Sequence, residues 1–173
     1  MSGIELRYAR VRTPNTETVV RDLRSGDFRA CDDIVQSLPY FFGSDVGVVA
    51  CARAVRTQRG WVAEECGQVN AFLVVDYPLP SAPEITWMAV RAGFRRRGLG
   101  RALIDRVVRE LRAAGALVLS VLTLAASVPE TGSDTYAGTR AFYLSNGFLA
   151  VREIHPPGWD SQALLLARPL VRN

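Results

Sequence analysis

The hydrophobic pattern in the middle of the chain changes twice, from a short apolar run to a helical period and back. Residues 84–90 form the first run, and from 99 to 114 a leucine or valine recurs at every fourth position, with polar residues on the opposite face. A second apolar run covers 116–124, after Gly115, a natural helix terminator. This order predicts a strand, a helix and a strand, and a helical crossover of this kind joins parallel strands.

The segment before this unit carries several turn and cap signals. Asp27 stands where a helix N-cap is expected, and Pro39 is where that helix should end. The prolines at 78, 80 and 83 mark a turn before the first apolar run. The predicted elements are, in chain order, a strand at 18–24, a helix at 27–39, a helix from Asp45, and a hairpin of strands at 61–65 and 69–77.

The end of the chain predicts one more helix and two strands. A polar loop at 127–133 precedes a helix at 135–146, and strands follow at 148–154 and 163–170. We therefore predict a single α/β (α+β) domain, with a central mixed, mostly antiparallel twisted sheet of about six to seven strands flanked by helices. This domain covers 16–173, and the charged, aperiodic residues 1–15 predict a flexible N-terminal arm.

A basic, glycine-bearing turn joins the first apolar run to the helix, with the sequence Arg95-Arg96-Arg97-Gly98-Leu99-Gly100. The first N–H groups of a helix have no intrahelical acceptor and lie at the positive end of the helix dipole, so they suit an anion. The Gly-Lys-Ser/Thr of the P-loop is absent, and Leu103 replaces the third glycine of a dinucleotide fingerprint. Arginines are unfavourable at a helix N-terminus unless an anion binds there. We predict a phosphate site, with a solvated basic surface as the alternative.

Two segments of the chain resemble signatures of the GNAT superfamily of N-acetyltransferases. The turn at 95–100 has the form Arg-x-x-Gly-x-Gly, which is similar to the family's diphosphate-binding motif. The segment 140–148 resembles a second signature, a short helix that carries a tyrosine, here Tyr143, and ends in Gly147-Phe148. The predicted order of strands and helices is also that of the family.

The resemblance implies acetyl-CoA as co-substrate, with its diphosphate on the turn at 95–100. Many family members place an asparagine two helical turns before the tyrosine, where Tyr136 stands in this chain, so Thr139 or Tyr136 would supply that polar contact. The resemblance implies these cofactor-binding residues: Met88, Ala89, Val90, Arg95, Arg96, Arg97, Gly98, Leu99, Gly100, Arg101 and Thr139.

Transfer of an acetyl group from a thioester to an amine needs a base for the amine and a proton for the departing thiolate. Glu84 is the candidate base, because alternate strand residues share a face and Glu84 should then point with Thr86, Met88 and Val90. Asp76, Glu64 and Glu65 are rival carboxylates, and Glu84 could also be a solvated strand-end residue. Tyr143 matches the family's proton donor, the alternative being a core aromatic residue.

The acceptor that the resemblance implies is a primary amine. Asp76 lies on the neighbouring hairpin, and Phe41, Phe42 and Trp159 lie in loops that shape the acceptor site in the family; aromatic residues there favour an apolar or ring-bearing small molecule. A protein α-amine or lysine is the alternative within this class. A non-catalytic acyl-CoA-binding module and an arginine-driven nucleic-acid binder are the alternatives from other classes.

Composition and charge bear on the partners, metal sites and cellular location that the protein can have. The net charge is +4 and no lysine occurs in the chain, so every cationic side chain is arginine. No recognisable nucleic-acid motif, membrane-length apolar run or signal-peptide core is present. Three cysteines and one histidine predict reduced thiols and no metal site. We expect a cytoplasmic protein without nucleic-acid or membrane partners, and leave open a homodimer.

Overall fold

A computed structural model of the chain describes residues 17–42, 45–126 and 134–171, which form a seven-stranded sheet of order β1-β2-β3-β4-β5-β7-β6. Only the β4–β5 pair is parallel. The predicted mixed, mostly antiparallel sheet is thus confirmed. The strands are β1 (Thr18–Asp22), β2 (Arg59–Glu65), β3 (Gln68–Leu79), β4 (Ala82–Val90), β5 (Val118–Leu124), β6 (Leu149–Ile154) and β7 (Ala163–Pro169).

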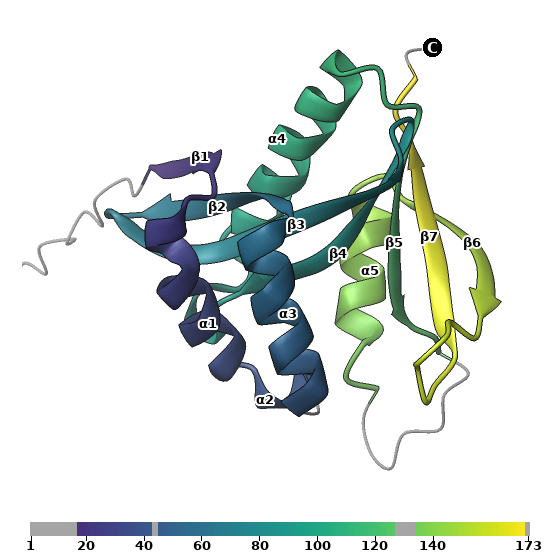
Figure 1. Ribbon diagram of the computed structural model, residues 1–173, viewed down its shortest axis with the longest axis horizontal. Coiled ribbons are helices and arrows are strands. Elements are labelled where there is room, and N and C mark those ends of the chain that lie inside the picture. The colour runs from purple at the N-terminus through teal and green to yellow at the C-terminus, as the bar shows by residue number, and fades with distance from the viewer. Residues whose placement is uncertain (1–16, 43–44, 127–133, 172–173) are drawn as a thin grey trace, which may run out of the picture.

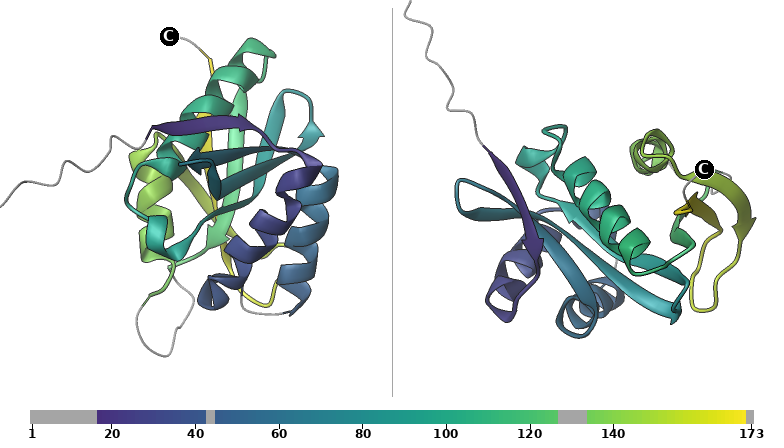
Figure 2. Two further views of the ribbon diagram at one scale, coloured as in Figure 1. Left: turned by 90° about the vertical axis from the view of Figure 1, so that its left-hand side faces the viewer. Right: turned by 90° about the horizontal axis from the view of Figure 1, so that it is seen from above.

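Helices cover both faces of the sheet (Figures 1 and 2). On one face lie α1 (Phe28–Gln36) and α3 (Asp45–Thr57), and on the other lie α4 (Leu99–Ala113) and α5 (Ala137–Ser145). Each face has its own apolar cluster, one packed under α1 and α3 and one under α4 and α5. The shorter elements are α2 (Pro39–Phe42) and two 3₁₀ turns, η1 (Ser25–Asp27) and η2 (Ala92–Phe94).

The apolar stripe predicted for 99–114 forms the buried side of α4. Leu99, Leu103, Val107 and Leu111 are each at most 1% exposed, because their spacing places all four against the sheet. The helix connects β4 to β5, and these two strands are parallel as predicted. The β-α-β unit is therefore the part of the fold that local sequence pattern specifies best.

The sheet separates between β4 and β5. The register joins them only at Glu84–Ser120 and Ile85–Val121, whereas β4 stays paired with β3 as far as Val90. Within the described strands, β5 therefore supplies no register partner to the second half of β4. This opening lies beside the start of α4, where the basic turn is.

A β-bulge in β4 changes which side chains share a face. Val74 of β3 lies opposite Trp87 and Val75 lies opposite Ile85, so Thr86 is the additional residue. Ile85 and Met88 both pack in the α4-side cluster, whereas Trp87 packs in the other. The prediction that Glu84 points with Met88 and Val90 is wrong, because the bulge reverses the alternation between them.

Several predicted boundaries are also corrected. Asp27 does not cap α1; its carboxylate accepts hydrogen bonds from Arg21 and from the Arg24 N–H. Pro39 starts the one-turn helix α2. β1 ends at Asp22, and the prolines at 78 and 83 lie within β3 and β4, next to an irregular register that tolerates the missing N–H. The predicted arm at 1–15 and the loop at 127–133 lie outside the described residues.

All three cysteines are free thiols, as predicted. Burial raises the pKa of Cys31 and of Cys51 to about 12, so both are protonated and unreactive at neutral pH. Cys66 is exposed in the tight turn between β2 and β3.

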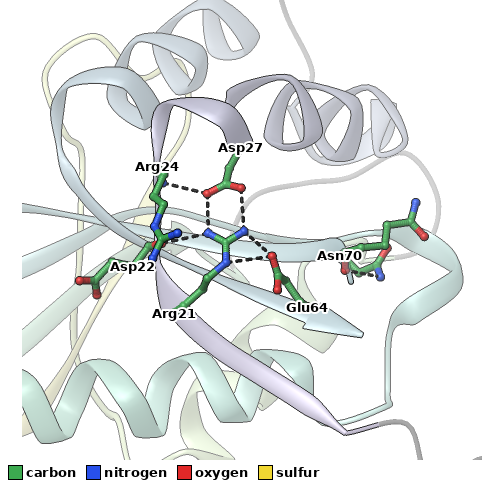
Figure 3. Close-up of polar contacts among 7 residues, drawn as sticks. Arg21, Asp22, Arg24, Asp27, Glu64 and Asn70 are labelled. Atoms are coloured by element: carbon green, nitrogen blue, oxygen red, sulfur yellow. Dashed lines mark hydrogen bonds and ion pairs between the residues drawn. The ribbon is translucent and has the colours of Figure 1, made fainter. Parts of the chain in front are cut away.

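A three-residue charge cluster fastens the first strand to the sheet (Figure 3). The Arg21 guanidinium donates to both carboxylate oxygens of Asp27, at 2.7 and 2.8 Å, and its Nε lies 2.9 Å from Glu64. Asp27 is 8% exposed, so its carboxylate depends on this pairing. The hydrogen bonds from the Arg21 guanidinium hold the pKa of the Asp27 carboxyl below its usual range.

We expect Arg21→Met to destabilise the fold by about 2 kcal/mol, since it leaves a buried carboxylate unpaired, and to lower Tm by roughly 4–8 °C. The stabilisation of the fold by the ionised Asp27 carboxylate is fully present above the carboxyl's unfolded-state pKa. It is lost as pH falls through the depressed folded-state pKa. The difference in Tm between wild type and variant should therefore shrink at acidic pH. Thermal unfolding at a series of pH values measures it.

The control is Arg56→Met, which breaks the more exposed pair with Asp32. This variant should lose under about 1 kcal/mol. Equal losses for the two variants, or a pH-independent loss for Arg21→Met, would contradict the role given to the cluster.

Candidate active site

A cavity of about 570 Å³ opens where β4 and β5 separate. Its walls come from α2, the second half of β4, the basic turn with the start of α4, and α5. Three arginines line it, and none of the described lining residues is a carboxylate. Among the lining residues are Phe41, Phe42, Met88, Ala89, Val90, Arg95, Arg96, Gly98, Leu99, Gly100, Arg101, Thr139, Phe142 and Tyr143.

The turn before α4 has the backbone of an anion-binding loop. Gly98 has φ 93° and Arg96 has φ 60°, both in the left-handed region. α4 begins at Leu99, and no described side chain caps it, so the N–H groups of its first turn have no acceptor within the helix. Arg95, Arg96 and Arg101 add positive charge around these groups. The turn can therefore hold a phosphate or diphosphate.

Gly100 allows a close approach in the first turn of α4. A Cβ atom at this position would lie 3.1 Å from the Met88 methyl group and 3.1 Å from the Phe142 ring. Glycine thus lets the helix start pack directly against β4 and α5, which encloses the cavity on this side.

Arg97, predicted to bind the cofactor, points elsewhere. Its guanidinium lies 2.7 Å from the Glu65 carboxylate and 4.9 Å from the centre of the Phe94 ring. Glu65 is 5% exposed, and Arg97 is not among the described residues that line the cavity. The side chain of Arg97 is therefore placed to hold the turn against the end of β2.

We expect Glu65→Gln to weaken binding of coenzyme A to the turn by roughly fivefold to tenfold, the equivalent of about 1–1.4 kcal/mol. The reason is that the loss of the ion pair releases Arg97 and loosens the backbone beside Gly98. Calorimetric titration with coenzyme A measures the effect.

The control Asp32→Asn removes an ion pair with Arg56 on the opposite face of the sheet and should leave the affinity unchanged. Unaltered affinity in Glu65→Gln would show that the Arg97 ion pair does not position the turn.

Tyr143 is a buried residue in the lining of the cavity. The residue is 5% exposed, and its hydroxyl donates to the Met88 sulfur at 3.9 Å. Phe142 and Phe148 hold the ring edge-to-face, with centroid distances of 5.3 and 5.2 Å. Burial raises the pKa of the phenol above its ordinary value, so the hydroxyl is protonated at neutral pH and has a proton to donate.

Glu84 is not among the described lining residues of the cavity. It lies opposite Asp76 in the β3–β4 register, so the two carboxylates share a face of the sheet. Burial, and then the charge of Asp76, raise the pKa of Glu84 above its ordinary value. Both causes make this carboxylate a stronger base than an exposed glutamate.

The one-turn helix α2 forms one wall of the cavity. Arg95 lies 4.3 Å from the centre of the Phe41 ring, and the Tyr136 hydroxyl donates to the Phe41 carbonyl at 2.6 Å. Phe42 stacks on Trp87 at 5.6 Å. The structure thus brings both predicted phenylalanines to the cavity.

Two other residues that were predicted to contact a ligand do not line the cavity. Tyr136 and Trp159 are not among the described lining residues, and Trp159 lies between β6 and β7. Thr139 does line the cavity and is available for a polar contact. Sequence reasoning missed Leu38, Phe94 and Phe142 as cavity residues, although Phe142 lies within the second signature segment.

The fold and the site define an acetyltransferase domain, and comparison with known proteins agrees. Residues 56–149, more than half of the chain, match the family described as acetyltransferase (GNAT) domain. The chain therefore belongs to the GNAT acetyltransferase family. A search of curated proteins gave no match.

Solved structures share this fold at low sequence identity. A GNAT-family protein from Desulfovibrio desulfuricans is 20% identical with a TM-score of 0.75, over 90% of this chain and 100% of that one. The ribosomal-protein-S18-alanine N-acetyltransferase from Escherichia coli is 21% identical with a TM-score of 0.70, over 91% and 96%. An aminoglycoside 6′-N-acetyltransferase complexed with coenzyme A is 14% identical with a TM-score of 0.66, over 90% and 98%.

No helix among the described residues combines the length and hydropathy that crossing a membrane requires.

Proposed function

We propose that this protein is an N-acetyltransferase that transfers the acetyl group of acetyl-CoA to a primary amine. The observation that carries this proposal is that one cavity is lined both by residues of the basic turn before α4 and by Tyr143, whose hydroxyl is buried. Between them runs the half of β4 that β5 leaves unpaired. A long substrate with a diphosphate at one end and a reactive thioester at the other suits such a site.

The residues of the turn fit a nucleotide diphosphate. The left-handed Gly98 aims the following N–H groups outward, and the three cavity arginines supply charge for two phosphates. Met88, Ala89 and Val90 supply backbone groups along the opening, and Thr139 supplies a hydroxyl on the opposite wall. Acetyl-CoA carries the groups that each part of this wall can bind.

In the proposed reaction the ammonium form of the acceptor loses a proton to Glu84, directly or through water, and the neutral amine attacks the thioester carbonyl carbon. A C–N bond forms, the C–S bond breaks, and the proton from Tyr143 goes to the departing sulfur. The second proton that the nitrogen loses as the amide forms returns to the Tyr143 oxygen. The products are an amide and the free thiol. The raised pKa of Glu84 suits the base, and burial keeps Tyr143 protonated for its role as donor.

The bulge at Thr86 bears on how the acceptor would approach. It places Glu84 on the face covered by α1 and α3, whereas Met88 and Tyr143 belong to the α4 side. We infer that the amine enters from the α1–α3 side and meets the thioester at the opening between β4 and β5. Phe42 and Trp87 would then contact the acceptor.

A small molecule with an apolar or ring-bearing group is the acceptor that this aromatic wall favours. Related folds include enzymes named for an alanine of ribosomal protein S18 and for an aminoglycoside, so the choice between acceptor types needs a direct test. Release of free coenzyme A thiol should be measured against a library of small primary amines and of peptides with free N-termini. Turnover with peptides alone would contradict the small-molecule assignment, and no turnover with any amine would contradict the activity.

We expect Tyr143→Phe to lower kcat by roughly tenfold to 100-fold, while the affinity for acetyl-CoA changes by less than about threefold. The hydroxyl acts only as the thiolate departs, so its loss affects the transition state more than binding. Steady-state kinetics with the best amine from the library measure both parameters. Unchanged turnover would remove Tyr143 from the reaction.

A further inference from the structure

The hydrogen bond between Tyr143 and Met88 joins two groups with unusual chemistry. The buried hydroxyl of Tyr143 donates to a thioether sulfur, at 3.9 Å. Sulfur is a weak acceptor, and a buried tyrosine hydroxyl ordinarily finds an oxygen. In the proposed reaction the same hydroxyl donates to the sulfur of the thioester. The Met88 sulfur therefore marks the place where a substrate sulfur would meet Tyr143.

The rest of the Met88 side chain is closely surrounded. Its methyl group lies so near the start of α4 that a Cβ at Gly100 would be only 3.1 Å from it. Phe142 is equally close to that position and is held edge-to-face by Tyr143. Met88 thus lies between the first turn of α4 and the phenol, in the lining of the cavity.

Met88 has a more adaptable side chain than its neighbours in the cavity lining. Methionine has an unbranched side chain with three rotatable bonds and can change rotamer at low cost. Its neighbours Phe142 and Tyr143 are fixed by mutual ring packing, and Ala89 faces the other apolar cluster. A substrate that enters the opening can displace the thioether, but only as far as Gly100 and Phe142 permit.

We propose that Met88 is a specificity-determining residue that restricts the acyl group of the thioester to short chains. This inference rests on the proposed function, because it assumes that an acyl-CoA occupies the cavity. The displaced methionine side chain occupies the volume that the distal carbons of a longer acyl chain would need. Removing the side chain beyond Cβ would open that volume and leave the residues of the turn at 95–100 unchanged.

The test compares the dissociation constants of acetyl-CoA, butanoyl-CoA and unacylated coenzyme A, measured by calorimetry. Wild type should bind butanoyl-CoA at least about tenfold more weakly than acetyl-CoA, because the two extra methylenes of the butanoyl group do not fit a closed pocket. In Met88→Ala the two acyl-CoAs should bind within about twofold of each other. Met88→Leu keeps the volume without the sulfur and should retain the wild-type ratio of the dissociation constants of butanoyl-CoA and acetyl-CoA.

Leu111→Ala is the control for general loosening, because it creates a void in the same apolar cluster at a residue outside the described cavity lining. It should leave the ratio unchanged. A ratio that stays at the wild-type value in Met88→Ala, or that falls equally in Leu111→Ala, would overturn the role of Met88. Absence of any binding of unacylated coenzyme A to wild type would instead overturn the proposed function, and the inference with it.

Discussion

Replacing Gly98 with valine is expected to lower the affinity for acetyl-CoA by at least about 100-fold and to abolish the rise in Tm that the compound produces. Gly98 has φ 93°, a conformation closed to a β-branched residue, so the variant must rebuild the turn. The N–H groups of Leu99 and Gly100 would then no longer point together. Thermal unfolding with and without acetyl-CoA, followed by calorimetric titration, measures the loss.

The chain offers a matched control for this substitution. Gly115 follows the same helix, has φ 85°, and has no atom within 4 Å of the position a Cβ would take. Gly115→Val therefore imposes a similar backbone strain at the far end of α4, away from the cavity. It should lower stability but retain the shift with acetyl-CoA. Retention of the shift in Gly98→Val would show that the turn is not the phosphate site.

Glu84→Gln is expected to lower kcat by about 100-fold or more, with the affinity for acetyl-CoA unchanged. Glutamine keeps the size of the side chain but cannot accept the amine proton. Because Glu84 lies on the α1–α3 face, away from the described cavity lining, the substitution should leave cofactor binding intact. Steady-state kinetics and calorimetric titration on the same preparation separate the effect on kcat from the effect on affinity. Wild-type turnover would transfer the role of base to another carboxylate.

The pH dependence of the reaction gives a second test of this residue. Glu84 must be ionised to act as a base, so kcat/KM should fall as pH drops through its raised pKa. Asp76 contributes to that raised value, so Asp76→Asn should lower the pKa and move the acidic limb to lower pH. An acidic limb that stays in place would contradict the assignment of Glu84.

Local pattern was sufficient to predict the centre of the fold. The stripe of α4 has a period that only a helix satisfies, and the crossover rule then requires β4 and β5 to be parallel. The prediction that the turn at 95–100 binds an anion also uses local pattern, since helix-start geometry depends on neighbouring residues alone. The segment around Tyr143 likewise carries its signal in consecutive residues.

The face on which Glu84 lies could not be predicted in this way. The bulge at Thr86 arises from the register between β4 and β3, and register depends on a partner strand rather than on alternation within one strand. One additional residue is enough to reverse the expected grouping of Glu84 with Met88.

The roles of individual arginines and aromatic residues also depended on distant partners. Arg97 and Arg96 are adjacent in sequence, yet Arg97 pairs with Glu65 on another strand while Arg96 lines the cavity. Tyr136 likewise has a distant partner, because its hydroxyl donates to the carbonyl of Phe41, 95 residues earlier in the chain. Such choices follow from tertiary packing, which the local pattern does not contain.

The main-chain amides at the start of α4 are the central feature of the proposed site, and a crystal structure of the protein soaked with acetyl-CoA tests them most directly. It should show diphosphate oxygens within hydrogen-bond distance of N–H groups between Gly98 and Arg101, with the thioester sulfur beside the Tyr143 hydroxyl and the Met88 side chain moved aside. Acetyl-CoA bound at another place, with those amides facing protein or solvent, would contradict the proposed site and the acetyl transfer that depends on it.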